Sequence, residues 1–224
     1  MNQSEMLEML EISSIAYRDN QPRCRCSRLI VIENEATDAE CFVRIGENIV
    51  IIAFRGTDSN INRFYNLCFA KKVIPYDNYD TDIRVHSGFL ATYKSVRSRI
   101  LPLIPEEAEK VVVTGHSLGA ALSVLCAVDV QYNFKSKDVE AYLFGCPRVG
   151  NKAFAKSYDK RVFKTMRVSN GNDVVTKIPP KILGFHHVGI DIHTGSVALP
   201  LVLSFRDHTS QSYYRNLWTA MNFR

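Results

Sequence analysis

Apolar residues recur along this chain at helical spacing in some segments and as short runs in others. Phe89, Tyr93, Val96 and Ile100 follow one another at steps of four, three and four, which predicts one face of a helix ending near Pro102. Further helices are predicted over residues 3–17 and 117–131, after Gly150, and from about Ser210 onward. Short apolar runs predict strands at 29–32, 41–45, 48–54, 110–115, 139–144 and 161–168, and short strands near 184–194.

This alternation of strands and helices predicts an α/β fold with a mostly parallel central sheet flanked by helices. The chain has 224 residues, of which 46% are hydrophobic and 23% charged, values ordinary for a soluble globular protein. That length fits one well-filled core and is short for two domains. We therefore expect a single domain over residues 1–224, with no internal repeat.

Composition excludes several classes of function. The most apolar windows, 118–130 and 197–203, are too short to cross a bilayer, and the first residues lack the features of a signal peptide. An intracellular protein is favoured on this basis, and a secreted mature form stays possible. The net charge of +5 is modest, and the basic cluster in 18–28 is interpreted as a solvated loop, so nucleic acid is not an expected partner. The six cysteines form no metal or redox pattern, and Cys126 and Cys146 are expected in the core.

The segment 111–119 carries the strongest chemical signal in the chain. Three valines lead into Gly115-His116-Ser117-Leu118-Gly119, and a run of small apolar residues follows. A strand, a tight turn and a helix in this order present a serine as a nucleophile, and glycines on both sides let strand and helix approach. Because of this context we interpret Ser117 as a nucleophile rather than a structural turn serine.

An activated serine needs a carboxylate that orients its base, and Asp173 is the preferred candidate. It lies in a Gly/Asn turn directly after the strand predicted at 161–168. Asp159 precedes that strand, and Asp191 falls within an alternating run typical of a strand. A turn-forming role is the alternative for Asp173.

The base is expected later in the chain, where four histidines compete. His208 stands directly before the closing helix, in a loop that can hold an imidazole over Ser117. His186 and His187 follow Asp173 closely and are interpreted as strand-edge or packing residues. His193 lies in the run that contains Asp191. His208 is therefore the predicted base.

Negative charge develops on the substrate oxygen during acyl transfer, so an oxyanion hole is required. The N–H of Leu118, at the start of the predicted helix, is one candidate donor. Strand 48–54 ends in Phe54-Arg55-Gly56-Thr57, where Thr57 can offer its backbone N–H and its hydroxyl.

Taken together, these segments resemble the class 3 lipases, the fungal-lipase-like branch of the α/β-hydrolase fold. The resemblance rests on motifs in the family order: 54–57 (FRGT), 85–89 (VHSGF), 115–119 (GHSLG), 144–150 (FGCPRVG), 172–175 (NDVV) with Pro179-Pro180, and 207–208 (DH). It implies Ser117, Asp173 and His208 as nucleophile, acid and base, an oxyanion hole from Thr57 and Leu118, and neither cofactor nor metal. Acylglycerol hydrolysis is the implied activity, with a lipid ester as substrate. Phospholipase A1, a soluble-substrate esterase and a catalytically silent interaction module are the alternatives.

The resemblance also implies a lid, for which residues 59–82 are the candidate segment. Residues 59–69 can form an amphipathic helix that makes transient contact with a lipid surface, although Arg63 stands where a tryptophan is typical of the family. A packed surface helix is the alternative. The sole tryptophan, Trp218, is expected in the core. The oligomeric state is left open.

Overall fold

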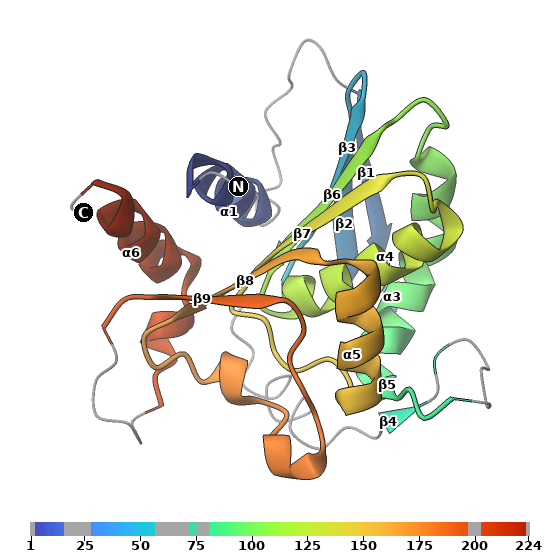
Figure 1. Cartoon of the computed structure of the whole chain (residues 1–224). Helices are drawn as coiled ribbons and strands as arrows, with labels where there is room; N and C mark the ends of the chain where they lie inside the picture. The colour runs from blue at the N-terminus through green and yellow to red at the C-terminus, as the bar shows by residue number, and fades with distance from the viewer. Residues whose placement is uncertain are drawn as a thin grey trace.

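A seven-stranded sheet forms the centre of the computed structural model, which describes residues 3–15, 28–56, 72–73, 75, 81–196 and 203–222. Its strands are β1 (Arg28–Asn34), β2 (Ala39–Ile45), β3 (Ile49–Phe54), β6 (Lys110–His116), β7 (Asp138–Phe144), β8 (Lys164–Asn170) and β9 (Ile190–Thr194), in that spatial order. The pairs β1–β2 and β2–β3 are antiparallel, and β3, β6, β7, β8 and β9 are mutually parallel. This is the predicted α/β architecture (Figure 1).

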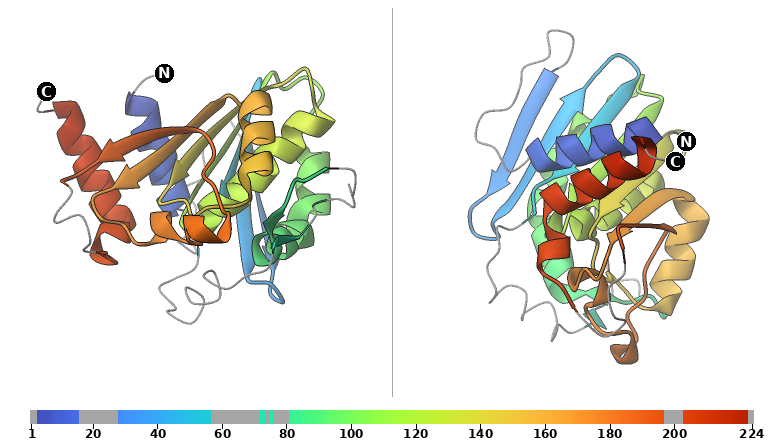
Figure 2. Two further views of the ribbon diagram at one scale, coloured as in Figure 1. Left: turned by 60° about the horizontal axis from the view of Figure 1, so that its bottom comes forward. Right: turned by 90° about the vertical axis from the view of Figure 1, so that its left-hand side faces the viewer.

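Helices cover both faces of the sheet. On one face lie α3 (Ser87–Ile100), α4 (Leu118–Asn133) and α5 (Lys152–Arg161), and on the other α1 (Gln3–Ile15) and α6 (Ser210–Asn222) run side by side (Figure 2). A short second sheet pairs β4 (Lys72–Val73) with β5 (Val85–His86). Among the described helices, none is long and apolar enough to cross a membrane.

The position of β6 at the centre of the sheet explains why its valines follow one another without alternating with polar residues. Val111 and Val113 are fully buried in the core beneath α3, α4 and α5, whereas Val112 packs into the second core beneath α1 and α6. Successive side chains of a strand point to opposite faces, so a strand covered on both faces is apolar at every position.

Most predicted elements are confirmed within a few residues. The strand expected at 161–168 begins instead at Lys164, because α5 continues through Arg161. Of the short strands expected near 184–194, the structure has β9 over Ile190–Thr194. Cys126 and Cys146 are buried, as expected.

The prediction that Trp218 belongs to the core is wrong. Its side chain is 47% exposed, whereas Tyr213 and Leu217 turn toward the sheet and are buried. Tyr213 and Leu217 are four positions apart and share one face of α6, and the residue after Leu217 is rotated about 100° away from that face.

Candidate active site

Ser117 occupies a sharp turn between β6 and α4. Its backbone has φ 60° and ψ −126°, a conformation that residues with a side chain rarely adopt. Such strain costs on the order of 1–3 kcal/mol and persists only where the surroundings fix it. Here the Ser117 N–H donates to the Phe144 carbonyl at 2.9 Å, and the Ser117 carbonyl accepts from Ala120 N at 3.0 Å. The predicted nucleophile thus stands at the carboxyl end of β6 and the amino end of α4.

The two flanking glycines are required by close backbone approach. A Cβ on Gly115 would overlap the Gly119 carbonyl group. A Cβ on Gly119 would overlap the Phe54 carbonyl oxygen and come within 3.0 Å of the Gly56 nitrogen. The turn after β6 therefore packs directly against the turn after β3, and neither position has room for a side chain.

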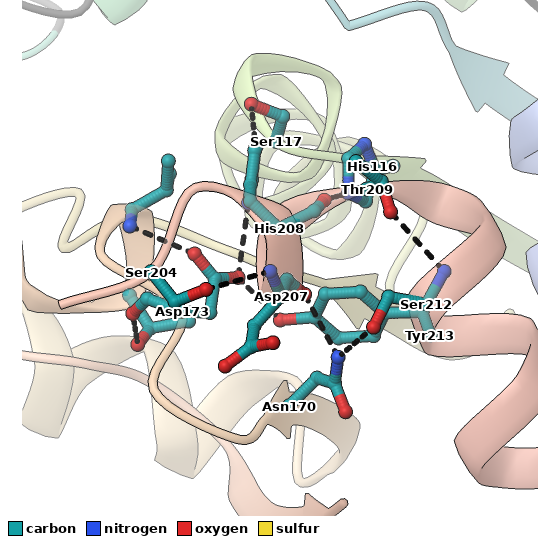
Figure 3. A network of polar contacts seen from close by, with 12 residues as sticks. His116, Ser117, Asn170, Asp173, Ser204, Asp207, His208, Thr209, Ser212 and Tyr213 are labelled. Atoms are coloured by element: carbon teal, nitrogen blue, oxygen red, sulfur yellow. Dashed lines mark hydrogen bonds and ion pairs between the residues drawn. The ribbon is translucent and has the colours of Figure 1, made fainter. Parts of the chain in front are cut away.

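Ser117, His208 and Asp173 are brought together from three distant segments (Figure 3). His208 Nε2 lies 2.8 Å from Ser117 Oγ, and His208 Nδ1 lies 2.9 Å from Asp173 Oδ2. The His208 side chain is 16% exposed and that of Asp173 only 1%. Asp173 follows β8, and His208 closes the 3-10 turn η5 (Arg206–His208) that precedes α6. This chain of contacts has the geometry of a nucleophile, a base and a carboxylate that orients the base.

The Asp173 carboxylate accepts two further hydrogen bonds. The Tyr213 hydroxyl donates to Oδ2 at 2.5 Å, and the Val175 N–H donates to Oδ1 at 2.8 Å. Burial raises the pKa of Asp173, but the interactions with His208, Tyr213 and Val175 outweigh burial and lower the pKa below its ordinary value. Asp173 is therefore ionised at neutral pH, although it is almost wholly buried.

Asn170, at the end of β8, fastens the segment that carries His208. Its amide nitrogen donates to the Asp207 carbonyl at 2.8 Å and to Ser212 Oγ at 2.9 Å, and its oxygen accepts from Asn216 Nδ2 at 2.7 Å. The Asp207 carboxylate in turn accepts from the Asn172 N–H at 2.9 Å. The loop of the predicted base is thus tied to the loop of the predicted acid.

His116 contacts His208 on the side away from Asp173. The two rings stack with centroids 4.6 Å apart, and His116 Nε2 lies 2.7 Å from the His208 carbonyl oxygen. Burial, together with the neighbouring His208 ring, lowers the pKa of His116 to about 3. His116 is therefore neutral at neutral pH, and its Nε2–H is the donor, because a carbonyl oxygen can only accept.

The competing acids interact elsewhere. Asp159 lies on α5 and accepts from the Gly189 N–H at 2.8 Å. Asp191 lies in β9, is half exposed and pairs with the Arg167 guanidinium at 2.8 Å. The alternating run around Asp191 was thus correctly interpreted as a strand.

The competing histidines also have partners outside the site. His187 Nε2 is 2.8 Å from the Thr176 carbonyl oxygen, and His193 Nδ1 is 3.1 Å from Ser169 Oγ. The backbone N–H of His186 donates to the Gly150 carbonyl at 2.7 Å, which places this residue beside Gly150. His186 and His187 precede β9 rather than belonging to a strand.

Of the two expected oxyanion donors, one lies within the described residues. Leu118 is the first residue of α4, and the first N–H groups of a helix have no intrahelical acceptor and meet the positive end of the helix dipole. Thr57 lies outside the described residues, as does most of the lid candidate 59–82. Among the residues that are described, no group of three or more histidine, cysteine or acidic side chains is placed to hold a metal ion.

Sequence reasoning missed His116, Asn170 and Tyr213. His116 occupies the variable position of Gly-x-Ser-x-Gly, and nothing local shows that its ring meets a residue 92 positions away. Asn170 carried a signal that was available, since it is a polar residue directly before the turn of Asp173. Tyr213 contacts Asp173 because of the angle at which α6 packs against the sheet.

Comparison with known proteins identifies the family of the chain. The family described as Lipase (class 3) matches residues 51–183, which is more than half of the chain. The phospholipase A1 DAD1 of Arabidopsis thaliana, described as chloroplastic, is 35% identical over 165 residues, or 65% of this chain. A lipase of Rhizomucor miehei is 34% identical over 151 residues, or 64% of this chain. These matches amount to 37% and 41% of the two relatives, so the chain spans about two fifths of their length.

Solved structures agree with the fold. The Rhizomucor miehei lipase in complex with its propeptide superposes with a TM-score of 0.74 at 27% identity, covering 85% of this chain and 68% of that one. A structure described as a triacylglycerol lipase with a serine protease triad gives a TM-score of 0.73 at 28% identity, covering 85% of this chain and 79% of that one.

Proposed function

Since the chain belongs to the class 3 lipase family, we propose that it is a serine hydrolase that cleaves carboxylic esters of lipids. One observation carries the proposal: His208 lies 2.8 Å from Ser117 Oγ on one side and 2.9 Å from Asp173 on the other. Relatives described as lipases and as a phospholipase A1 support the substrate class. Acylglycerols are the proposed substrates.

In the proposed reaction Ser117 Oγ attacks the ester carbonyl carbon while its proton passes to His208 Nε2. The tetrahedral intermediate collapses, the bond to the alcohol oxygen breaks, and the Nε2 proton moves to that oxygen. Ser117 is left acylated. A water molecule then attacks the acyl carbon, gives its proton to His208 Nε2, and the fatty acid leaves as Ser117 recovers the proton.

Asp173 has two tasks in this scheme. Its ionised carboxylate accepts from Nδ1–H of His208 and so keeps Nε2 free to take the serine proton. It also stabilises the imidazolium that forms during each half-reaction. Its lowered pKa supports this role, because a protonated carboxyl group at this position would do neither.

The N–H of Leu118 and Thr57 are the proposed hydrogen-bond donors to the oxyanion. The support for Leu118 is its place at the start of α4, next to Ser117. Thr57 is next in sequence to Gly56, whose nitrogen a Cβ on Gly119 would contact. Removing one such donor costs roughly 2.7–4 kcal/mol of transition-state stabilisation in well-studied hydrolases.

A phospholipase A1 is the second candidate, favoured by the 35% identity to a relative of that description. Both reactions use the same acyl transfer and differ in the group that leaves. Glycerides and phospholipids therefore need to be compared as substrates on the same protein.

The test is the rate of tributyrin hydrolysis measured across its solubility limit. We expect turnover that falls on the order of a millionfold in Ser117→Ala, with an unchanged thermal unfolding temperature. Ser95→Ala, a serine on α3 that bonds to Thr37, is the matched control and should keep activity. A rise in rate when droplets appear would support a working lid over residues 59–82. Substantial turnover by Ser117→Ala would overturn the proposed function.

A further inference from the structure

An exposed apolar tip projects from the short 3-10 turn η4 (Lys181–Leu183). The Ile182 residue is 93% exposed and Leu183 is 48% exposed. Isoleucine and leucine are among the residues most often buried, and two adjacent exposed ones on a turn are unusual in a water-facing surface. The tip therefore needs an explanation beyond folding.

The tip is held out by a rigid support. The Gly184 N–H donates to the Lys181 carbonyl at 2.8 Å, and Gly184 adopts φ 76°, which ends the turn. Directly after it, Phe185 is buried with 1% exposure. Arg148 donates to the Pro179 carbonyl at 2.9 Å on the approach to the turn. Because the chain is anchored on both sides of η4, the fold itself holds Ile182 in its exposed position.

The tip lies at the same end of the molecule as the candidate active site. The turn η4 follows the Asp173 loop beyond the carboxyl end of β8, and it lies at the lower edge in Figure 1 and in the right-hand view of Figure 2, with η5 above it. Leu203, five residues before His208, is 59% exposed. The tip and the segment leading to His208 therefore both adjoin the loop that carries Asp173.

The charged side chains in the chain segment that forms the tip are all positive. Residues 174–189 contain no aspartate or glutamate, and they include Lys177 and Lys181, both exposed. Arg206, next to the site, is also exposed. Apolar side chains beside lysines are typical of segments that enter the headgroup region of an anionic lipid surface.

We infer that Lys177, Lys181, Ile182, Leu183 and Leu203 form a docking surface for an anionic lipid membrane. The inference deepens the proposed lipid-ester hydrolysis by naming what brings the chain to its substrate, and it does not require the lid candidate to act. Ile182 and Leu183 enter the surface, and the two lysines contact the anionic headgroups. The site end then faces the lipid.

The binding of Ser117→Ala protein to vesicles tests this inference without consuming the lipid. The vesicles are phosphatidylcholine alone and phosphatidylcholine with phosphatidylglycerol. We expect binding to the mixed vesicles, and added salt should weaken it. Lys177 and Lys181 should each contribute about fivefold to the affinity for these vesicles. Adding Ile182→Ser and Leu183→Ser should weaken binding by at least about tenfold, since each loses the burial of an apolar side chain.

Phe163→Ser is the matched control. Phe163 is 69% exposed and precedes β8, at the opposite end of the parallel strands, so its replacement should leave vesicle binding unchanged. Thermal unfolding of each variant verifies that it folds.

Any of three vesicle results would overturn the inference: no binding to mixed vesicles, equal binding to both vesicle types, or equal loss in Phe163→Ser and in the tip variants. Dimers that dissociate in Ile182→Ser when no vesicles are present would assign the tip to a second copy instead, and would also overturn it. Vesicle binding by a wild-type chain that hydrolyses no ester would refute the proposed function and leave the docking surface standing.

Discussion

The His116 ring lies against the His208 ring at 4.6 Å between centroids, and its Nε2–H donates to the His208 backbone carbonyl at 2.7 Å. The residue directly before the proposed nucleophile therefore holds the proposed base at two points, its ring and its backbone. Because His116 stays neutral, it adds no charge that would oppose the imidazolium during turnover.

Replacing His116 with Phe keeps an aromatic ring and removes the donor. A buried carbonyl left without its partner costs about 1–3 kcal/mol, and the loop can relieve this by moving His208. We expect kcat for a soluble ester to fall about tenfold with little change in KM. His116→Gln, whose amide can donate to the same carbonyl, should recover part of the loss. Wild-type kcat in His116→Phe would show that the contact has no positioning role.

Acid should destabilise the fold through its buried histidines. Burial comes first among the causes that lower the pKa of His116 and His187 to about 3, whereas an unfolded histidine titrates near 6.5. Between these values the unfolded state binds more protons, so the unfolding free energy falls as pH decreases. A buried histidine of this kind contributes a loss of about 2 kcal/mol by about pH 5.

Asp173 adds to the acid sensitivity at lower pH. Because its folded pKa is lowered, the stability it contributes is present above the unfolded pKa and is lost as pH falls through the folded one. Urea unfolding at a series of pH values measures the combined effect. His187→Gln, which keeps a donor to the Thr176 carbonyl, should give a flatter curve than the wild type. Parallel curves of unfolding free energy against pH for the wild type and His187→Gln would show that His187 does not contribute to the acid sensitivity.

Asp173→Asn should slow ester hydrolysis on the order of ten-thousandfold, as the equivalent change does in serine proteases. An asparagine can present an N–H to Nδ1, which places the His208 proton on Nε2, where it faces Ser117. Asp191→Asn is the matched control, since Asp191 pairs with Arg167 on β9 and should be dispensable for turnover. If instead Asp191→Asn lost activity and Asp173→Asn kept it, the acid would have to be reassigned.

Gly119→Ala tests the close contact between the two turns. The new Cβ would meet the Phe54 carbonyl oxygen and the Gly56 nitrogen, so the turn that leads to Thr57 must shift. We expect a loss of about 1–3 kcal/mol in unfolding free energy and a larger relative loss of kcat. Gly46→Ala, where the nearest atom is a flexible Ile49 methyl at 3.3 Å, should leave activity unchanged. Normal activity in Gly119→Ala would mean that the turns move apart at no cost.

The parts of the site predicted from sequence are those fixed by local chemistry and by element order. The turn at Ser117 needs glycine on both sides, so its signature lies within five residues. Asp173 and His208 were found because each stands beside the end of a recognisable element. The same information predicted most of the strands, since β3, β6 and β7 each contain a short apolar run, whereas β9 alternates.

The parts that sequence did not reveal depend on how helices pack. Tyr213 reaches Asp173 and Trp218 points to solvent because of the angle and rotation of α6 against the sheet. Which face of α6 meets the sheet decides both properties, and the contact of Tyr213 with a residue 40 positions away is not encoded in a local spacing. Asn170 works through three partners, Asp207, Ser212 and Asn216, which approach it only once α6 is docked.

The hydrogen bonds from Asn170 to Asp207, Ser212 and Asn216 imply an order in which the parts of the site form during synthesis on the ribosome. The chain emerges with Ser117 and its strained turn first, and the residues that place a base beside that serine come about ninety positions later. Until α6 leaves the exit tunnel and is captured by β8, the nascent protein holds a serine hydroxyl without its base. Under the proposed function, reactivity therefore depends on the docking of α6, and a translation product interrupted before α6 would leave the Ser117 hydroxyl without its base.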